Sequence, residues 1–351
     1  MNPRATLIFD LRITPQTGIQ HGGEGDGSNI VPIRRMACNI QDADGSWDQV
    51  LIPCVSGGAM KGVLRQIATR HHLSILGIGE GQVSRAALRL LAKGGLLSGS
   101  TGQSVGIEEA RRLCRLFPVL GAFGAMDNSL SMGGAWKGTD IRPYTRETAH
   151  LPWMRSTWGE ESAAPVAPIA LDLVTTEVTH YRHDIGHSNL AHLITAADRA
   201  TIEDKAADKK TAKAAGKALP AKERREANDS MPHTAEVITP GTPLAGQVQL
   251  INALEAERSC AMVAIAIWRQ EGAIIGGASG KGHGRCEVEI VNARLLDGAA
   301  AVPVILDGVA LPVRYLDAEE GVRGAWDRYH AHIEVNRAEA LDELARIGAM
   351  S

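Results

Sequence analysis

The sequence has 351 residues, 44% of them hydrophobic and 22% charged, which is the composition of a soluble globular protein. Its formal net charge of −3 excludes a global basic field, so any site for a polyanion must be a local concentration of Lys and Arg. The few aromatic residues (six Trp, four Tyr and three Phe) argue against a surface that grips nucleobases mainly by ring stacking.

The cysteines indicate a reducing compartment. There are five, scattered along the chain: Cys38, Cys54, Cys114, Cys260 and Cys286. Since they form no C-x-x-C pair and no secretory signal is recognised, we expect reduced thiols in a cytoplasmic protein. No apolar run approaches the ~20 residues needed to span a membrane, so no membrane partner is expected.

The N-terminal region predicts a strand, a loop and a hairpin. ATLIFDLRI (5–13) alternates apolar and polar side chains, which is typical of a half-buried strand. A glycine-rich loop over 14–35 follows and ends in Arg34 and Arg35. The turn DADGSW then predicts a hairpin whose second strand lies at 49–53.

SGGAMKGVLRQIATRHH (56–72) predicts an amphipathic helix. Lys61, Arg65 and His72 fall on a different face from its apolar stripe. Ser56 is a candidate N-cap. The helix would then present three outward-pointing amides as a site for an anion, those of Gly57, Gly58 and Ala59.

Two more helices are expected in the following region. The first, 83–93, stops at two glycines and aligns basic residues at i, i+4 and i+8, namely Arg85, Arg89 and Lys93. The second, 107–117, is expected to bury Ile107, Ala110, Cys114 and Phe117. Its opposite face would expose three arginines, Arg111, Arg112 and Arg115.

Residues 138–242 differ in composition from the flanking sequence, and we interpret them as an insertion into a domain formed by 1–137 and 243–351. The Ala/Lys-rich segment 203–229 has almost no large apolar residues. It cannot bury much surface, so a solvated helix or a flexible projection is favoured over core.

The C-terminal region again resembles a core. It predicts a strand at 246–252, a helix at 254–270, a glycine loop and a strand beginning near Cys286. A hairpin around 306–308 and one or two amphipathic helices complete the chain. Without the insertions, the order of elements is that of the split βαβ of a ferredoxin-like, α+β sheet.

The glycine loop GGASGKGHGRCEVEI (276–290) does not match the mononucleotide motifs. A P-loop fails because Ile275 stands at its first position and Gly282 follows Lys281. A dinucleotide fingerprint fails because a helix precedes the loop and a strand follows it. A tight connection explains two or three of the five glycines. The alternating Lys281, His283 and Arg285 suit a phosphate chain passing close to the loop.

Four segments in order resemble the RAMP superfamily of CRISPR-associated proteins. They are IPCVSGGAMKGVLR (52–65), LFPVLGAFGAMD (116–127), GTPLAGQVQL (241–250) and IGGASGKGHGRCEV (275–288). The length and the long insertion are similar to the seventh Cas family, the repeated backbone subunit of the effector complex, and most of all to its type IV version. The sequence departs from the family at Cys54–Val55, where Gly-Ser is commoner.

The resemblance implies an RRM-like (ferredoxin-like) palm with helical finger elements and an inserted β-hairpin thumb at about 172–242. In the thumb, VTTEVTHYRH would lie opposite HTAEVITP. Such subunits polymerise along the spacer of one CRISPR RNA and present its bases to a complementary target nucleic acid, for which DNA is favoured. Further partners would be more copies of the chain and other effector-complex subunits, with a helicase as one candidate. No cofactor is implied.

The resemblance also assigns residues to RNA binding. Those that match the helix and glycine-loop motifs are Ser56, Gly57, Gly58, Lys61, Arg65, Ser279, Lys281, His283 and Arg285. Arg34, Arg35 and Arg142 are further candidates for phosphate contacts, although isolated surface arginines are more often only solvated.

Two other sets of residues leave alternatives open. His180, His183, His187 and His192 with Asp184 carry zinc-binding groups, but their spacing matches no regular site, so solvated or RNA-contacting histidines are favoured. Asp26 lies where RNA-targeting relatives keep an aspartate for metal-dependent cleavage, although Asp is also at home in a glycine-rich turn. A non-catalytic guide-RNA subunit is the leading hypothesis. A ribonuclease subunit using Asp26 is the alternative, and a nucleotide-binding enzyme is the weakest.

Overall fold

The computed structural model describes residues 4–23, 30–41, 44–95, 106–127, 130–183, 230–297, 300–302 and 320–349. The chain forms two compact units. The larger comprises Met1–His21, Ile33–Thr175 and Ile238–Ser351, and the smaller comprises Gly22–Pro32 and Thr176–Val237. Residues 138–175, assigned to the insertion by the sequence analysis, thus belong to the larger unit.

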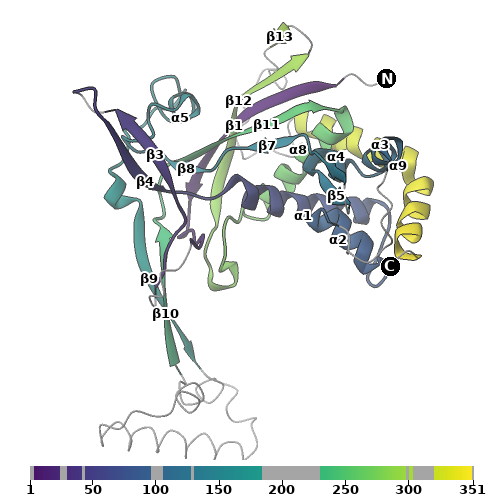
Figure 1. Ribbon diagram of the computed structural model, residues 1–351, viewed down its shortest axis with the longest axis horizontal. Helices are drawn as coiled ribbons and strands as arrows, with labels where there is room; N and C mark the ends of the chain where they lie inside the picture. The colour runs from purple at the N-terminus through teal and green to yellow at the C-terminus, as the bar shows by residue number, and fades with distance from the viewer. Residues whose placement is uncertain are drawn as a thin grey trace, which may run out of the picture. The chain divides into compact units, whose positions relative to one another are not determined.

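The main sheet of the larger unit has the order β13-β12-β1-β11-β7, and β8 also pairs with β11 (Figure 1). Every pairing in this sheet is antiparallel. The strands are β1 (Ala5–Pro15), β7 (Trp136–Gly138), β8 (Arg142–Pro143), β11 (Leu244–Ala253), β12 (Cys286–Asp297) and β13 (Ala300–Val302). The predicted strands over 5–13 and 246–252 and the one near Cys286 are confirmed.

Two hairpins stand outside this sheet. The first pairs β3 (Arg35–Gln41) with β4 (Trp47–Pro53), as the DADGSW turn predicts. The second pairs β5 (Ala125–Asp127) with β6 (Leu130–Met132).

The smaller unit holds a separate sheet. Its order is β2-β10-β9, from β2 (Ile30–Val31), β10 (Ser230–Ile238) and β9 (Thr175–His183). β10 runs parallel to β2. Because β9 neighbours β10, the predicted pairing of VTTEVTHYRH with HTAEVITP is confirmed.

Helices accompany the sheet in an α+β architecture, as predicted (Figure 1). They are α1 (Gly57–Ile75), α2 (Arg85–Lys93), α3 (Ile107–Leu116), α4 (Pro118–Phe123), α5 (Pro152–Thr157), α8 (Glu255–Gln270) and α9 (Glu320–Ala349), with short 3₁₀ turns η1 (Leu171–Leu173) and η4 (Ser279–Lys281). α8 contacts α1, α4 and α9 as well as β11. None of the described helices is both long and apolar enough to cross a membrane.

The core lies between the sheet and these helices. Phe9, Leu11 and Ile13 alternate along β1 and are fully buried, because successive strand side chains point to opposite faces of a sheet. Trp268 of α8 and Tyr329 of α9 are the largest of the fully buried side chains. The C-terminal region contributes one long helix, α9, and the predicted hairpin at 306–308 lies outside the described residues.

Tertiary packing corrects the predicted helix faces. On α1, Arg65 is 7% exposed and His72 is fully buried, so these two residues do not share an open face with Lys61. On α3, Ile107 is 67% exposed, whereas Leu113 and Leu116 are buried. Other elements packed against α1 and α3 set which side is covered, and a helical repeat alone does not contain that information.

Candidate nucleic-acid interface

The N-terminus of α1 is closed by side chains of the protein itself. Ser56 is the N-cap, and its Oγ accepts a hydrogen bond from the Ala59 amide at 3.2 Å. The Gly57 amide donates to Oδ1 of Asp140 at 3.0 Å. The prediction of three outward amides is therefore wrong for Gly57 and Ala59, while Gly58 is exposed and has open space where a Cβ would stand.

A short bridging segment, Gly18–His21, connects this helix start with the glycine loop. Nε2 of His21 accepts a hydrogen bond from the Ser56 amide at 3.3 Å. On the other side, the Gly277 amide donates to the carbonyl oxygen of Gln20 at 2.7 Å, and the Gly284 amide donates to that of Gly18 at 2.9 Å. The start of α1 and the glycine loop, which are far apart in the chain, are thus both held by this one segment.

His21 has an electrostatic setting that fits its role as an acceptor. Burial lowers the pKa of His21, and the positive charge of Arg34 lowers it further, against an opposing effect of Asp140. A neutral imidazole keeps a lone pair on one ring nitrogen, and the hydrogen bond from Ser56 requires that lone pair on Nε2.

Two of the loop's glycines are required by internal packing. A Cβ at Gly276 would collide with the carbonyl oxygen of Gln20, and one at Gly284 with that of Ile275. Both residues, and also Gly282, have positive φ, which favours glycine. Gly280 differs, since its φ is not positive and no atom lies within 4 Å of a Cβ built there. A Cβ at Gly282 would also meet no atom within 4 Å, so the loop's open backbone flanks Lys281 on both sides.

The polar side chains of the loop divide into two groups. Ser279, Lys281 and Arg285 are exposed. His283 is half-buried, and its Nδ1 lies 3.1 Å from the carbonyl oxygen of Gly18. The loop thus presents Lys281 and Arg285 outward, while His283 also holds the loop against the bridging segment.

Positive charge gathers around Lys61 on the first turns of α1. Lys61 is half-buried, and burial lowers its pKa, with further lowering by the positive charges of Arg65 and Lys137. Neither Lys61 nor Lys137 forms an ion pair with any carboxylate in the described part of the chain. A cluster of like charges without a counter-ion is suited to binding an anion supplied from outside.

Arg65 lies behind this cluster and does not face solvent. Its Nε donates to the carbonyl oxygen of Leu91 in α2 at 3.0 Å, and its Nη2 is shielded from solvent without a hydrogen-bond partner. Burial lowers the pKa of Arg65 to about 10, so the side chain remains charged at neutral pH. The structure therefore gives Arg65 a role in joining α1 to α2 and not the surface position that the sequence pattern predicts.

Three further arginines lie near the start of α1. Arg34 and Arg35 are exposed, and Arg142 is half-buried with Nη2 at 2.9 Å from the sulfur of Met36. Burial raises the pKa of the adjacent Cys54 thiol, Asp140 raises it further, and Arg34 and Arg142 oppose this. Cys54 is thus a neutral, buried thiol, and the departure at Cys54–Val55 leaves the N-cap of α1 in regular form.

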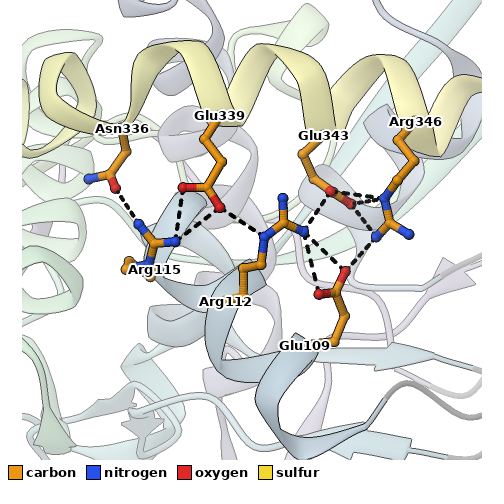
Figure 2. Close-up of polar contacts among 7 residues, drawn as sticks. All are labelled: Glu109, Arg112, Arg115, Asn336, Glu339, Glu343 and Arg346. Atoms are coloured by element: carbon orange, nitrogen blue, oxygen red, sulfur yellow. Dashed lines mark hydrogen bonds and ion pairs between the residues drawn. The ribbon is translucent and has the colours of Figure 1, made fainter.

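The arginines of α3 are engaged within the protein, which argues against a role in binding phosphate. Figure 2 shows Arg112 and Arg115 pointing at polar side chains of α9. Arg112 lies 2.8 Å from carboxylate oxygens of both Glu339 and Glu343. Arg115 pairs with Glu339 at 2.9 Å. The positive charge of these two arginines is therefore compensated by carboxylates of the protein itself.

Sequence reasoning missed three contributors to this region. Lys137 stands in the short strand β7, and its charge matters only because β7 contacts α1. His21 and Asp140 contact the helix start from loops distant in sequence. A signal existed only for His21, which lies in the glycine-rich segment that the sequence analysis marked.

Several predicted residues lie outside the described part of the chain, among them Asp26, Asp184, His187, His192 and the segment 203–229. Their roles stay predictions. Within the described ranges, no group of three or more His, Cys, Asp or Glu side chains is arranged to hold a metal ion.

Comparisons with known proteins find similarity among solved structures. No family model matches the chain, and no curated protein matches it. Among solved structures, it is similar to a chain of a structure titled "Type IV-B CRISPR Complex", with 19% sequence identity, a TM-score of 0.49, and coverage of 88% of this chain and 97% of that chain. At this level of similarity, a functional proposal has to rest on the residues of the chain itself.

Proposed function

We propose that this protein is a backbone subunit of a CRISPR ribonucleoprotein effector complex, which binds the phosphates of the CRISPR RNA along its spacer. One observation carries the proposal. The bridging segment Gly18–His21 holds the two signature segments together, at the start of α1 and in the glycine loop. Each of these segments presents a basic side chain without an ion pair among the described residues, Lys61 on the helix and Lys281 on the loop.

The topology of the main sheet supports an RRM-like palm. Four of its strands lie side by side in the order β12-β1-β11-β7. Along the chain, α1 lies between β1 and β7, and α8 lies between β11 and β12. This is the arrangement of two split βαβ units in a ferredoxin-like sheet. In the same proposal, the β9–β10 pair is the thumb hairpin and the remaining helices supply the finger elements.

The chemistry of the interface suits backbone contacts more than base reading. Lysine and arginine bind phosphate oxygens whatever the sequence, so they fix the position of an RNA without selecting it. The candidate phosphate-binding side chains are Lys61, Lys137, Lys281, Arg285, Arg34, Arg35 and Arg142, with Ser279 and the exposed backbone at Gly58 and Gly280. Specificity would then come from base pairing between the guide RNA and a complementary target, with DNA favoured.

We further propose that the subunit is non-catalytic. Burial raises the pKa of the Cys54, Cys260 and Cys286 thiols, which makes them poor nucleophiles. Phosphate binding at the interface needs no chemical step. The alternative of RNA cleavage through Asp26 is tested by incubating the assembly with complementary RNA and Mg²⁺, since cuts abolished by Asp26→Ala would favour it.

Co-expression with a CRISPR array tests the main proposal. We expect the purified chain to carry RNA of defined length in a multi-copy assembly. A Lys61→Ala, Lys281→Ala double variant should lose this RNA, whereas Arg111→Ala on the exposed face of α3 should retain it. Purification of an RNA-free wild-type chain after co-expression would contradict the proposal.

A further inference from the structure

The β3–β4 hairpin carries an exposed apolar face. Trp47 and Leu51 are 69% and 59% exposed. They lie on the same side of β4, because they are four residues apart in one strand. The opposite side of the hairpin contributes Cys38 and Ile52 to the buried residues. Exposed large apolar side chains on a two-stranded hairpin are typical of an interaction surface.

The end of this hairpin is acidic. Asp44 and Asp48 are exposed; Asp44 lies in the turn before Trp47, and Asp48 points to the face of β4 opposite Trp47. Hydrogen bonds from the Ser46 side chain and amide lower the pKa of Asp44, so its carboxylate is charged at neutral pH. Any partner of this end of the hairpin should therefore combine an apolar hollow with positive charge.

A groove of that kind lies between α1 and α2, in the same unit. Its volume is about 630 Å³. The apolar part is lined by Leu73, Ile78, Val83, Leu88 and Ala92. Leu88 is 46% exposed, so none of the residues that the structure describes covers this part of the hollow.

Basic side chains border the groove on the α2 side. Arg85, Arg89 and Lys93 follow one another at i, i+4 and i+8, which places them along one edge of the helix. In the residues that the structure describes, none of the three has an ion-pair partner. Arg70, on the α1 side, already pairs with Glu271.

The groove also holds an unused hydrogen-bonding group. Thr69 lines it and is 2% exposed, yet its Oγ1 is buried without a hydrogen-bond partner. A buried Trp indole N–H needs an acceptor, and a hydroxyl oxygen can supply one. On docking, the indole N–H of Trp47 would therefore donate a hydrogen bond to the Thr69 hydroxyl, which has no partner among the described residues of the single chain.

Resting on the proposed multi-copy function, we propose that the β3–β4 hairpin of one copy docks into the α1–α2 groove of the next copy. Trp47 would enter the apolar hollow, while Asp44 in the turn meets Arg85, Arg89 and Lys93. The hairpin and α2 lie at opposite ends of the larger unit, so the contact forms between molecules (Figure 1). A contact between two different surfaces of the same protein adds copies head to tail, into a closed ring or an open filament.

The acidic tip decides between a protein and RNA as occupant. Carboxylates at Asp44 and Asp48 would repel phosphates, so the hairpin face does not suit a nucleic acid. The aliphatic floor of the groove offers no ring for bases to stack on. The hairpin therefore fits a protein partner, and the basic edge of the groove complements its acidic turn.

Charge reversal on each surface gives a direct test by analytical ultracentrifugation of the full chain with single-stranded RNA. Asp44→Lys, and separately Arg85→Glu with Arg89→Glu, should each abolish head-to-tail assembly. A mixture of the two variants should assemble again, because each hairpin then meets a groove of opposite charge. Failure of the mixture to assemble would overturn the proposal.

Trp47→Ala supplies a second readout, with Val335→Ala as control because Val335 is 86% exposed on α9. The first change should weaken self-association by about tenfold or more, and the control should not. Unchanged assembly of Trp47→Ala would also overturn the proposal. Binding of a short labelled RNA to single copies should persist in all these variants, while loss of RNA binding in the wild-type chain would contradict the proposed function instead.

Discussion

Arg65 of α1 donates a hydrogen bond from its Nε to the carbonyl oxygen of Leu91 in α2, at 3.0 Å. The same guanidinium lies against Gly94, where a Cβ would collide with it. Gly94 ends α2 in the left-handed conformation. A residue of the helix signature is thus used to attach the second helix to the first.

Substitution of Arg65 should therefore affect stability first. Arg65→Ala removes a hydrogen bond from a charged donor and leaves a cavity, so we expect the free energy of unfolding to fall by about 2 kcal/mol. Arg65→Met keeps most of the volume and should lose less. Urea unfolding measures both. An Arg65→Ala variant as stable as the wild type, but defective in RNA binding, would show that the side chain acts at the surface after all.

Lys61 should behave differently from Arg65. Lys61→Ala is expected to leave stability nearly unchanged and to weaken RNA binding equally for guides of different sequence, because phosphate contacts carry no sequence information. The slope of log affinity against log salt should become shallower by about 0.7 for each lost contact to single-stranded RNA. Lys137→Ala should have the same effect. Fluorescence anisotropy over a salt series measures it, and a loss that depends on guide sequence would contradict phosphate binding.

Two glycines of the loop form a matched pair. Gly284→Ala should destabilise the protein, because Gly284 has a φ of 87° and a Cβ there collides with the carbonyl of Ile275. Gly280→Ala should be as stable as the wild type, since a Cβ there meets nothing within 4 Å. If RNA passes close to Gly280, only that variant combines normal stability with weaker RNA binding. Thermal unfolding and anisotropy together separate the two effects.

His72 predicts how stability depends on pH. Its ring is fully buried, with Nδ1 at 3.0 Å from the Tyr329 hydroxyl, and burial lowers its pKa to about 3, with smaller contributions from His332 and His71. In the unfolded chain, a histidine binds a proton below a pKa of about 6.5. Between about pH 6.5 and pH 3, the unfolded state therefore binds more protons than the folded state. As the pH is lowered through this window, the free energy of unfolding should fall by up to about 1.4 kcal/mol per pH unit.

Urea unfolding at several pH values measures this slope. His72→Phe should reduce it, because the buried titrating group is gone. Replacement of the exposed His150 by Gln should leave the slope as it is. A His72→Phe variant with the slope of the wild type would show that other groups dominate the acid sensitivity.

The contact between α3 and α9 depends on Glu343 (Figure 2). Its side chain is 1% exposed and pairs with Arg112 at 2.8 Å. Burial raises the pKa of Glu343, but hydrogen bonds from Arg346 and Arg112 outweigh this and hold the pKa below its ordinary value. Glu343→Gln removes the charge that compensates both arginines and should lower the free energy of unfolding by about 2 kcal/mol or more.

Glu339→Gln is the matched control for that change, since its side chain is 39% exposed and solvent screens its ion pairs. We expect it to cost much less than Glu343→Gln. Equal losses in the two variants, measured by thermal unfolding, would show that burial does not decide the strength of this network.

The sequence by itself determined most of the secondary structure in the described regions. The alternation of ATLIFDLRI, the N-cap at Ser56 and the DADGSW turn depend on neighbours in the chain, and all three appear as predicted. The sequence also marked both signature segments, and with them Lys61, Lys281 and Arg285. Local patterns succeed here because backbone propensity and capping act within a few residues.

Only the tertiary structure decided which charges are available. Arg65 and Lys61 lie one turn apart on α1, yet packing against α2 buries the first and leaves the second accessible. The sequence predicts that the arginines of α3 are exposed, but Arg112 and Arg115 pair with carboxylates of α9. The bridging segment Gly18–His21 likewise joins parts of the chain that no local pattern connects. Burial and ion pairing depend on residues hundreds of positions away, and that is why the sequence could predict the elements of this interface but not their exposure.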